Sequence, residues 1–218
     1  MARDLVESRI WYVAYGSNLA TARFRCYLSG GRPAGGARDY LGCRDPRDPT
    51  RIEGVEVPGG LVFAGASRVW NGGMTFYDRT ATGGIAGCAY LVTTDQFGDV
   101  AAQELRRPPG GEFARDLSGL LPDVESVVAT GPGLYETVVR LGELAGLPMF
   151  TITHHDVASL VPASPTAAYL RWIILGLRET HAYDDARIAR YLAAAPGVRG
   201  AWSEPEIVAL AATAHAVA

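Results

Sequence analysis

The stretch from Trp11 to Leu19 (WYVAYGSNL) constrains the fold more than any other part of the sequence. Its first half is apolar at nearly every position, which predicts a strand over 10–15 that is buried on both faces. The strand stops at Gly-Ser-Asn, and a helix is expected over 20–28. A strand that ends in such a turn can present several backbone N–H groups at the mouth of a pocket. The turn is therefore a candidate site for an anion, or for an oxyanion formed during a reaction.

Three residues of this turn have properties that suit a binding site. Gly16 permits a positive φ, which a tight turn or an anion-binding nest needs. Ser17 and Asn18 carry short polar side chains that can bond to the local backbone or to a ligand. The alternative is an ordinary strand-to-helix turn, because short turn motifs have little specificity.

Composition limits the classes of protein that need to be considered. The chain has 218 residues, of which 48% are hydrophobic, and we expect one domain over 1–218. Its net charge of −3 and interspersed charges favour neither nucleic-acid nor membrane binding. The N-terminus lacks the apolar run of a signal peptide, and no segment has the length needed to span a bilayer. Three cysteines without CxxC spacing argue against a disulfide framework and a zinc site, so we expect a cytoplasmic protein.

Several short apolar runs separated by Gly-rich turns predict a sheet that curls or closes. Residues 29–60 are rich in Gly, Pro, Arg and Asp, and they predict a long surface excursion with one short strand and solvated charges. Ser164-Pro165, Asp184 and Ser203 mark the expected starts of three later helices. The remaining strands are expected over 60–70, 74–77, 85–92, 134–141 and 148–154.

One helix aims a carboxylate toward the interior. Thr93 and Gln96 have the spacing of a capping box, which starts a helix there. The apolar stripe that begins at Phe97 reaches its i+7 position at Glu104. A partly buried Glu can have a raised pKa, as a general acid or base at neutral pH requires. The alternative is that the helix has ended, or that Glu104 turns outward or pairs with a following arginine.

Five motifs in order make the chain similar to the gamma-glutamylcyclotransferase-like family. Each is weak alone, but their shared order is specific, and they extend over nearly the whole chain. The motifs are the Tyr15–Leu19 loop, Trp70-Asn71-Gly72-Gly73, Gly87-Cys88-Ala89-Tyr90 followed by Gln103-Glu104, Gly133-Leu134-Tyr135, and Ser164-Pro165 leading to Tyr169.

This resemblance implies an α+β fold with a small, closed or nearly closed mixed β-barrel flanked by helices. It also implies an enzyme that needs no metal or organic cofactor and cyclises a γ-glutamyl amide to 5-oxoproline, with release of an amine or amino acid. Glu104 would be the general acid and base. Backbone N–H groups of Tyr15, Gly16, Ser17, Asn18 and Leu19 would bind the oxyanion. Tyr15, Tyr135 and Tyr169 would shape the pocket and hold polar ends of the substrate.

The chain departs from the family pattern at two places. Residues 105–131 form an insertion after Glu104, which we interpret either as a lid or specificity element or as a packing appendage. The spacing from Ser164 to Tyr169 is one residue longer than in the family. The insertion and the arginine-rich residues 23–51 favour an unusual, larger leaving group. The leaving group itself stays open among dipeptides, glutathione-like peptides, γ-glutamylamines and γ-glutamyl-protected intermediates.

Other functions are less favoured by the sequence. His154-His155-Asp156 offers metal-binding side chains, but neighbours on a strand face opposite sides, so we expect no metal site. A hydrolase that uses Ser17 would need partners, and the Gly-x-Ser-x-Gly elbow is missing. A non-catalytic module of the same fold that binds a small molecule or a protein is the main alternative. The expected partner is a small γ-glutamyl molecule, bound by a monomer or a homodimer.

Overall fold

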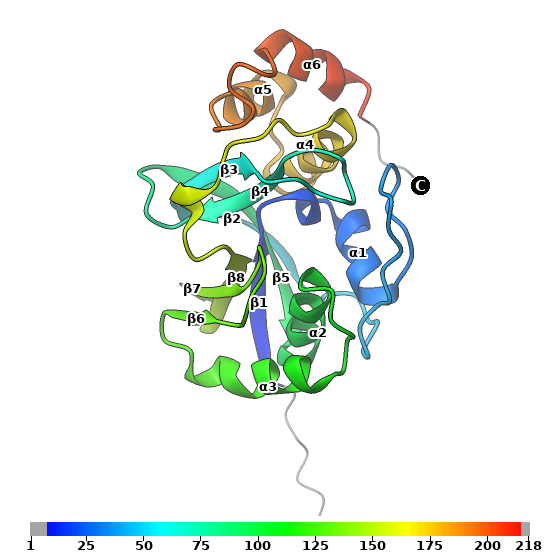
Figure 1. Cartoon of the computed structure of the whole chain (residues 1–218), viewed down its shortest axis with the longest axis vertical. Coiled ribbons are helices and arrows are strands. Elements are labelled where there is room, and N and C mark those ends of the chain that lie inside the picture. The colour runs from blue at the N-terminus through cyan, green and yellow to red at the C-terminus, as the bar shows by residue number, and fades with distance from the viewer. Residues whose placement is uncertain (1–7, 215–218) are drawn as a thin grey trace, which may run out of the picture.

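The centre of the computed structural model, which describes residues 8–214, is a six-stranded mixed sheet (Figure 1). Its order is β2-β5-β1-β8-β7-β6. The buried strand β1 lies in the middle, antiparallel to β5 and parallel to β8. The strands are β1 (Arg9–Ala14), β2 (Ile52–Pro58), β5 (Gly84–Thr93), β6 (Val127–Ala129), β7 (Thr137–Leu144) and β8 (Leu147–Thr153). The first strand is thus enclosed on both sides, as its continuous apolar sequence predicts.

A separate hairpin crosses one end of this sheet. It consists of β3 (Gly60–Ala64) and β4 (Met74–Asp78), which pair with each other, and Ala64 also forms an isolated bridge with Pro162. The turn between them packs tightly on a distant segment: a Cβ at Gly73 would lie 2.0 Å from the carbonyl oxygen of Ala163. The Trp-Asn-Gly-Gly sequence is therefore needed for close backbone packing as well as for the turn.

The predicted closed or nearly closed barrel is not formed, because the main sheet is open. Strands β2 and β6 form its two edges, and the hairpin does not join them into a ring within residues 8–214. Where β4 meets β8, the Thr153 side chain takes the place of hydrogen bonds between the two backbones. The Thr153 hydroxyl accepts a hydrogen bond from the Tyr77 N–H at 3.0 Å and donates to the Tyr77 carbonyl at 2.8 Å. The mixed α+β architecture is confirmed without barrel closure.

The region 29–60 contains one strand, as predicted, although the sequence did not place it. Strand β2 pairs with β5 from Ile52↔Tyr90 to Pro58↔Gly84. It is an edge strand with only one buried residue, Val57, so its sequence carries few apolar residues. Its strand character comes from pairing with the buried β5, which composition alone does not reveal.

Helices cover the sheet and hairpin (Figure 1). The capping boxes Thr93–Gln96 and Ser203–Glu206 are confirmed. The predicted cap at Ser164 is wrong, because Thr166 accepts the hydrogen bond from the Tyr169 N–H. No helix within 8–214 is long and apolar enough to cross a membrane. The helices are α1 (Thr21–Ser29), α2 (Thr94–Glu104), α3 (Glu112–Leu120), α4 (Ala167–His181), α5 (Asp185–Ala193) and α6 (Glu204–Ala212), with short 3-10 turns at Ser17–Leu19, Leu121–Asp123 and Val157–Ser159.

Candidate functional site

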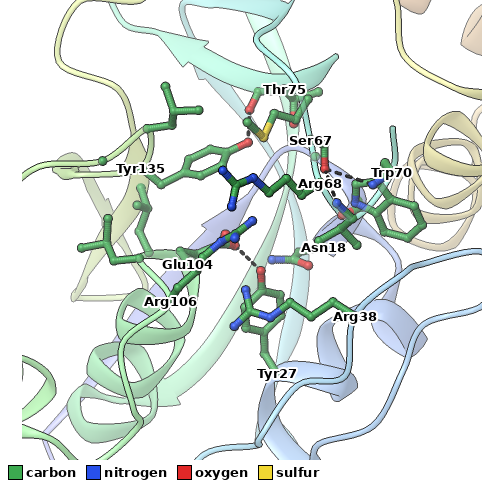
Figure 2. Close-up of a pocket in the computed structure, with 18 of the residues that line it drawn as sticks. Asn18, Tyr27, Arg38, Ser67, Arg68, Trp70, Thr75, Glu104, Arg106 and Tyr135 are labelled. Atoms are coloured by element: carbon green, nitrogen blue, oxygen red, sulfur yellow. Dashed lines mark hydrogen bonds between the residues drawn. The ribbon is translucent and has the colours of Figure 1, made fainter. Parts of the chain in front are cut away.

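A cavity of about 510 Å³ opens where β1 ends, between α1, the end of α2, the β3–β4 turn and residues 132–135. It gathers residues from nearly the whole length of the chain (Figure 2). Leu19 is fully buried in the core and does not line it. The other candidate residues from the sequence do line the cavity: Tyr15, Gly16, Ser17, Asn18, Glu104, Tyr135 and Tyr169.

The glycine of the first turn is required for a different reason from the predicted one. Gly16 has φ −110°, which is not a left-handed conformation. A Cβ at this position would lie 2.2 Å from Thr75 Oγ1 and 3.1 Å from Tyr169 Oη. The close approach of the hairpin and α4 therefore excludes a side chain here.

Backbone donors of this turn remain available to a ligand. The Leu19 N–H donates to the Gly16 carbonyl at 2.9 Å, so it cannot serve as an oxyanion donor while the 3-10 turn is intact. The N–H groups of Gly16, Ser17 and Asn18 have no acceptor in the described part of the chain, and all three residues line the cavity. Three amides at one wall can stabilise a developing negative charge.

Glu104 is the last residue of α2, and it points into the cavity as the apolar stripe predicts (Figure 2). Its side chain is partly buried, and Tyr27 Oη donates a 2.5 Å hydrogen bond to Glu104 Oε1. Burial raises the pKa of Glu104 above its ordinary value, although the Tyr27 bond and the charges of Arg23 and Arg38 pull it down. The carboxyl group is thereby brought closer to the range in which it can both accept and return a proton.

The sequence reasoning missed Arg23, which is only 2% exposed. Its guanidinium lies over the rings of Tyr27 and Tyr40, with 4.7 Å and 4.4 Å to their centroids. Arg23 Nη2 donates to Tyr40 Oη at 2.6 Å, whereas Nε and Nη1 have no partner in the described chain. A buried cation with two unused donors at a cavity wall is a site for a carboxylate. The available signal was its position on the buried face of α1, one residue before Phe24.

Asn18 presents a complementary unpaired atom. Its amide nitrogen donates to Tyr12 Oη at 3.3 Å, while its oxygen Oδ1 is buried and has no partner among the residues described. An unpaired buried acceptor is unfavourable unless a ligand satisfies it. The cavity thus offers unused donors on Arg23 and an unused acceptor on Asn18.

The three predicted pocket tyrosines have hydroxyl groups that are bonded within the protein. Tyr15 donates to the Ile152 carbonyl and Tyr135 to the Thr75 carbonyl, each at 2.7 Å. Tyr169 Oη lies 2.8 Å from Thr75 Oγ1 and accepts from the Thr75 N–H at 3.1 Å. These tyrosines shape the wall, and the hydroxyls of Tyr15 and Tyr135 can offer a ligand only an acceptor.

The segment that we interpret as an insertion, 105–131, contributes to packing at its centre and to the cavity at its edges. Helix α3 packs so closely on α2 that a Cβ at Gly98 would lie 2.3 Å from the Ala114 carbonyl oxygen. Leu105 and Arg106 follow Glu104 directly into the cavity wall, and residues 132–135 return to it. Helix α3 is a packing element against α2, whereas the first two residues of the segment, and residues 132–135 just after it, line the site.

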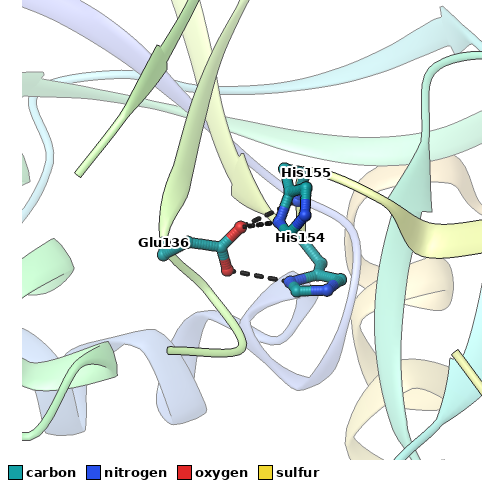
Figure 3. A group of neighbouring side chains, drawn as sticks. All are labelled: Glu136, His154 and His155. Atoms are coloured by element: carbon teal, nitrogen blue, oxygen red, sulfur yellow. Dashed lines mark hydrogen bonds and ion pairs between the residues drawn. The ribbon is translucent and has the colours of Figure 1, made fainter. Parts of the chain in front are cut away.

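A cluster outside the cavity holds the returning segment in place (Figure 3). The Glu136 carboxylate accepts hydrogen bonds of 2.9 Å from His154 Nδ1 and 2.8 Å from His155 Nδ1, with both rings donating. The ligand atoms of these three residues lie within 4.8 Å of one another, so they could hold a metal ion. The expectation that no metal is bound stays a prediction. The hydrogen bonds of Glu136 with His154 and His155 connect the end of β8 to the chain just after Tyr135.

Glu136→Gln is expected to remove an acid-sensitive contribution to stability. Burial raises the pKa of Glu136, but hydrogen bonds from His154 and His155 outweigh it and hold the pKa at about 2. Because the folded-state pKa lies below the unfolded value, the stabilisation is present above about pH 4.5 and is lost as pH falls through about 2. It amounts to about 2–3 kcal/mol. Urea unfolding at pH 5 and pH 2.5 measures the difference.

The matched control for this prediction is Glu143→Gln, on β7, the strand that begins just after Glu136, and it removes an exposed ion pair with Arg140. We expect a change of less than about 1 kcal/mol for the control at either pH. Equal losses at pH 5 in the two variants would contradict the role given to Glu136.

No protein-family model matches the chain. Histone deacetylase 5 of Arabidopsis thaliana is 30% identical over 212 residues, a match to 87% of this chain that spans about a third (32%) of that protein.

Two solved structures share the architecture. An uncharacterized human protein has a TM-score of 0.52 and 15% identity, covering 95% of this chain and 100% of its own. A gamma-glutamyl cyclotransferase has a TM-score of 0.51 and 15% identity, covering 94% and 99%. At this identity the likeness concerns the fold. The chain therefore shares its fold with a gamma-glutamyl cyclotransferase.

Proposed function

We propose that the protein is a gamma-glutamylcyclotransferase-type enzyme in which Glu104 is the general acid and base. The observation that carries the proposal is the placement of Glu104, with its raised pKa, in the same cavity as the Gly16–Asn18 turn and its unbonded amides. A base and oxyanion donors around one cavity are the two requirements of acyl transfer by an internal amine. The fold likeness to a gamma-glutamyl cyclotransferase supports the same choice.

The unpaired polar atoms of the cavity match the two charged groups on the α-carbon of a γ-glutamyl group. Arg23 Nε and Nη1 can donate to the α-carboxylate, and Asn18 Oδ1 can accept from the α-ammonium. The methylene groups of the substrate lie between these two charged groups and the reacting amide. Holding these groups at Arg23 and Asn18 and the γ-carbonyl at the Gly16–Asn18 amides folds the substrate, so that its α-nitrogen approaches its own γ-carbonyl carbon.

The chemistry moves two protons from one nitrogen to another. Glu104 takes a proton from the α-ammonium, and the free amine attacks the γ-carbonyl carbon to form a five-membered ring. Amides of Gly16, Ser17 and Asn18 stabilise the oxyanion. The C–N bond to the leaving group then breaks as Glu104 returns a proton to the leaving nitrogen. The second proton passes from the nitrogen of the new ring to the leaving amine. The products are 5-oxoproline and the leaving amine in its protonated form. The reaction consumes neither water nor an oxidant.

The experiment that tests this function is 5-oxoproline release from a panel of γ-glutamyl amino acids, γ-glutamylamines and larger γ-glutamyl conjugates. We expect release from at least one class, and none from the matching β-aspartyl amides, whose shorter chain would give a strained four-membered ring. An acetyl-lysine peptide is included because the Arabidopsis relative is named a deacetylase. Release of acetate without any 5-oxoproline would overturn the proposal.

Tyr27→Phe provides a pH-dependent check on the role of Glu104. The Tyr27 hydrogen bond lowers the Glu104 pKa, so its removal raises that pKa further. The base must be ionised to act, and the acid limb of the kcat/KM profile therefore moves to higher pH in the variant. Profiles from pH 4 to 9 measure the shift. An acid limb that stays in place or moves to lower pH contradicts the assignment.

The alternative is a non-catalytic module of the same fold that binds a small molecule. It predicts saturable binding of γ-glutamyl compounds with no turnover under any of these conditions. Calorimetry on the wild-type protein together with the 5-oxoproline assay separates the two functions.

A further inference from the structure

Charged side chains in the cavity are mostly cationic. Four arginines line it, Arg23, Arg38, Arg68 and Arg106, whereas Glu104 is the single acidic residue among its described lining residues. Arg23 lies deep, under Tyr27 and Tyr40. Figure 2 shows the other three guanidinium groups turned toward the part of the cavity where Glu104 lies. They come from three separate loops, so the cluster exists only in the folded chain.

These three arginines make no ion pair with an acidic side chain among residues 8–214, although the charge of Arg38 lowers the Glu104 pKa. Arg38 bonds only to the Gln103 carbonyl, at 3.4 Å, and stacks 5.0 Å from the Tyr40 ring. The side chains of Arg68 and Arg106 make no hydrogen bond or ion pair with the described residues. Many arginines elsewhere do pair with acids, as in Arg25–Asp48, Arg32–Asp39, Arg44–Asp99, Arg51–Glu53, Arg140–Glu143 and Arg178–Asp185. The cavity therefore holds three arginines whose charges no ion pair among the described residues neutralises.

Arg106 also occupies a backbone position that favours glycine. It has φ 58°, immediately after α2. Its N–H donates to the Gln103 carbonyl at 3.1 Å, and the Arg107 N–H donates to the Ala102 carbonyl at 2.8 Å. This is the Schellman pattern, in which the left-handed residue is usually glycine because other residues are strained there. The arginine side chain at this position is unfavourable for the backbone but supplies a cation to the cavity.

The γ-glutamyl group cannot use all of this charge. Its α-carboxylate needs one cation, which Arg23 can supply, and its α-ammonium adds a positive charge. Arg38, Arg68 and Arg106 then face the remainder of the substrate, which is the leaving group. Three clustered cations repel one another unless anions lie between them.

We propose that Arg38, Arg68 and Arg106 form an anion subsite that selects a leaving group with at least two negative charges. The proposal rests on the proposed function and names its substrate class. The shared chemistry is an amine that bears two carboxylates or a phosphate, such as an acidic amino acid joined to the γ-glutamyl group. The edge of the 105–131 segment takes part in this selection through Arg106.

The first test compares kcat/KM across substrates that differ in the charge of the leaving group. γ-Glutamyl-glutamate carries two carboxylates there, γ-glutamyl-alanine one, and γ-glutamyl-alaninamide none. γ-Glutamyl-phosphoethanolamine distinguishes phosphate from carboxylate. We expect kcat/KM to rise about tenfold for each added charge, and the preference to shrink as salt rises from 0.05 to 0.5 M. Equal kcat/KM values across the series would overturn the subsite while leaving the proposed function intact.

The second test uses Arg106→Gly, which removes the cation and relieves the left-handed strain. The ratio of kcat/KM for γ-glutamyl-glutamate to that for γ-glutamyl-alaninamide is expected to fall about tenfold. The Tm should not fall below that of the wild type, because glycine suits this conformation. Arg115→Gln, an exposed residue of α3 that does not line the cavity, is the matched control and keeps the ratio. An unchanged ratio in Arg106→Gly would contradict the assignment of this residue.

Binding separates failure of the subsite from failure of the proposed function. Calorimetry with Glu104→Gln measures the affinity for γ-glutamyl-glutamate and γ-glutamyl-alaninamide without turnover. Tighter binding of the first by tenfold or more, reduced by adding Arg106→Gly, supports the subsite even if the wild type releases no 5-oxoproline. Equal affinity for both compounds overturns it.

Discussion

Glu104→Gln is expected to reduce kcat for 5-oxoproline release by about 100- to 10,000-fold, with a smaller effect on KM. Glutamine keeps the shape of the side chain but cannot take the proton from the α-ammonium. The substitution also removes a partly buried carboxylate. That carboxylate accepts a 2.5 Å hydrogen bond from Tyr27 Oη and interacts with the charges of Arg23 and Arg38. Steady-state kinetics on the best substrate of the γ-glutamyl panel measure the change.

Folding is checked on the same preparation, because a collapsed cavity would also abolish turnover. We expect the Tm of Glu104→Gln to stay within a few degrees of the wild type and its affinity for substrate to persist. Glu112→Gln, at the start of α3 and outside the cavity lining, is the matched control with full activity. A loss of less than tenfold in kcat for Glu104→Gln would remove this residue from the role of base.

Arg23→Gln is expected to raise KM for γ-glutamyl substrates by about 10- to 150-fold. The reason is the loss of charge-assisted hydrogen bonds from the unpaired Nε and Nη1 to the α-carboxylate, each bond of this kind contributing about 1.5–3 kcal/mol. Removing the cation also raises the Glu104 pKa, so the comparison is made at a pH above the acid limb. Initial rates over a wide range of substrate concentrations give the two constants.

A second substrate distinguishes binding from a structural effect. When the α-carboxylate is replaced by a carboxamide, the wild type should lose most of the affinity that Arg23 provides, and Arg23→Gln should lose little more. The same loss on both substrates would show that Arg23 acts by supporting the Tyr27–Tyr40 stack instead.

Local sequence determined the features that depend on neighbouring residues. The apolar run before Gly16 specified the central strand, and the Thr93–Gln96 capping box together with the stripe from Phe97 directed Glu104 inward. These features follow from periods of two and 3.6 residues and from caps within a few residues, so they can be predicted without the tertiary structure. The order of five weak motifs was enough to indicate the fold family.

Tertiary structure alone decided the contacts between distant segments. Barrel closure was predicted wrongly, because whether β2 and β6 meet depends on the path of the whole sheet. Gly16 is needed because Thr75 and Tyr169 approach it, and neither is close in sequence. Arg23, Arg38, Arg68 and Arg106 are ordinary polar residues locally, yet they share one cavity because loops far apart in the chain converge there. A charge gains its function from its surroundings in space, since burial and nearby charges set the electrostatics of a site and sequence spacing does not.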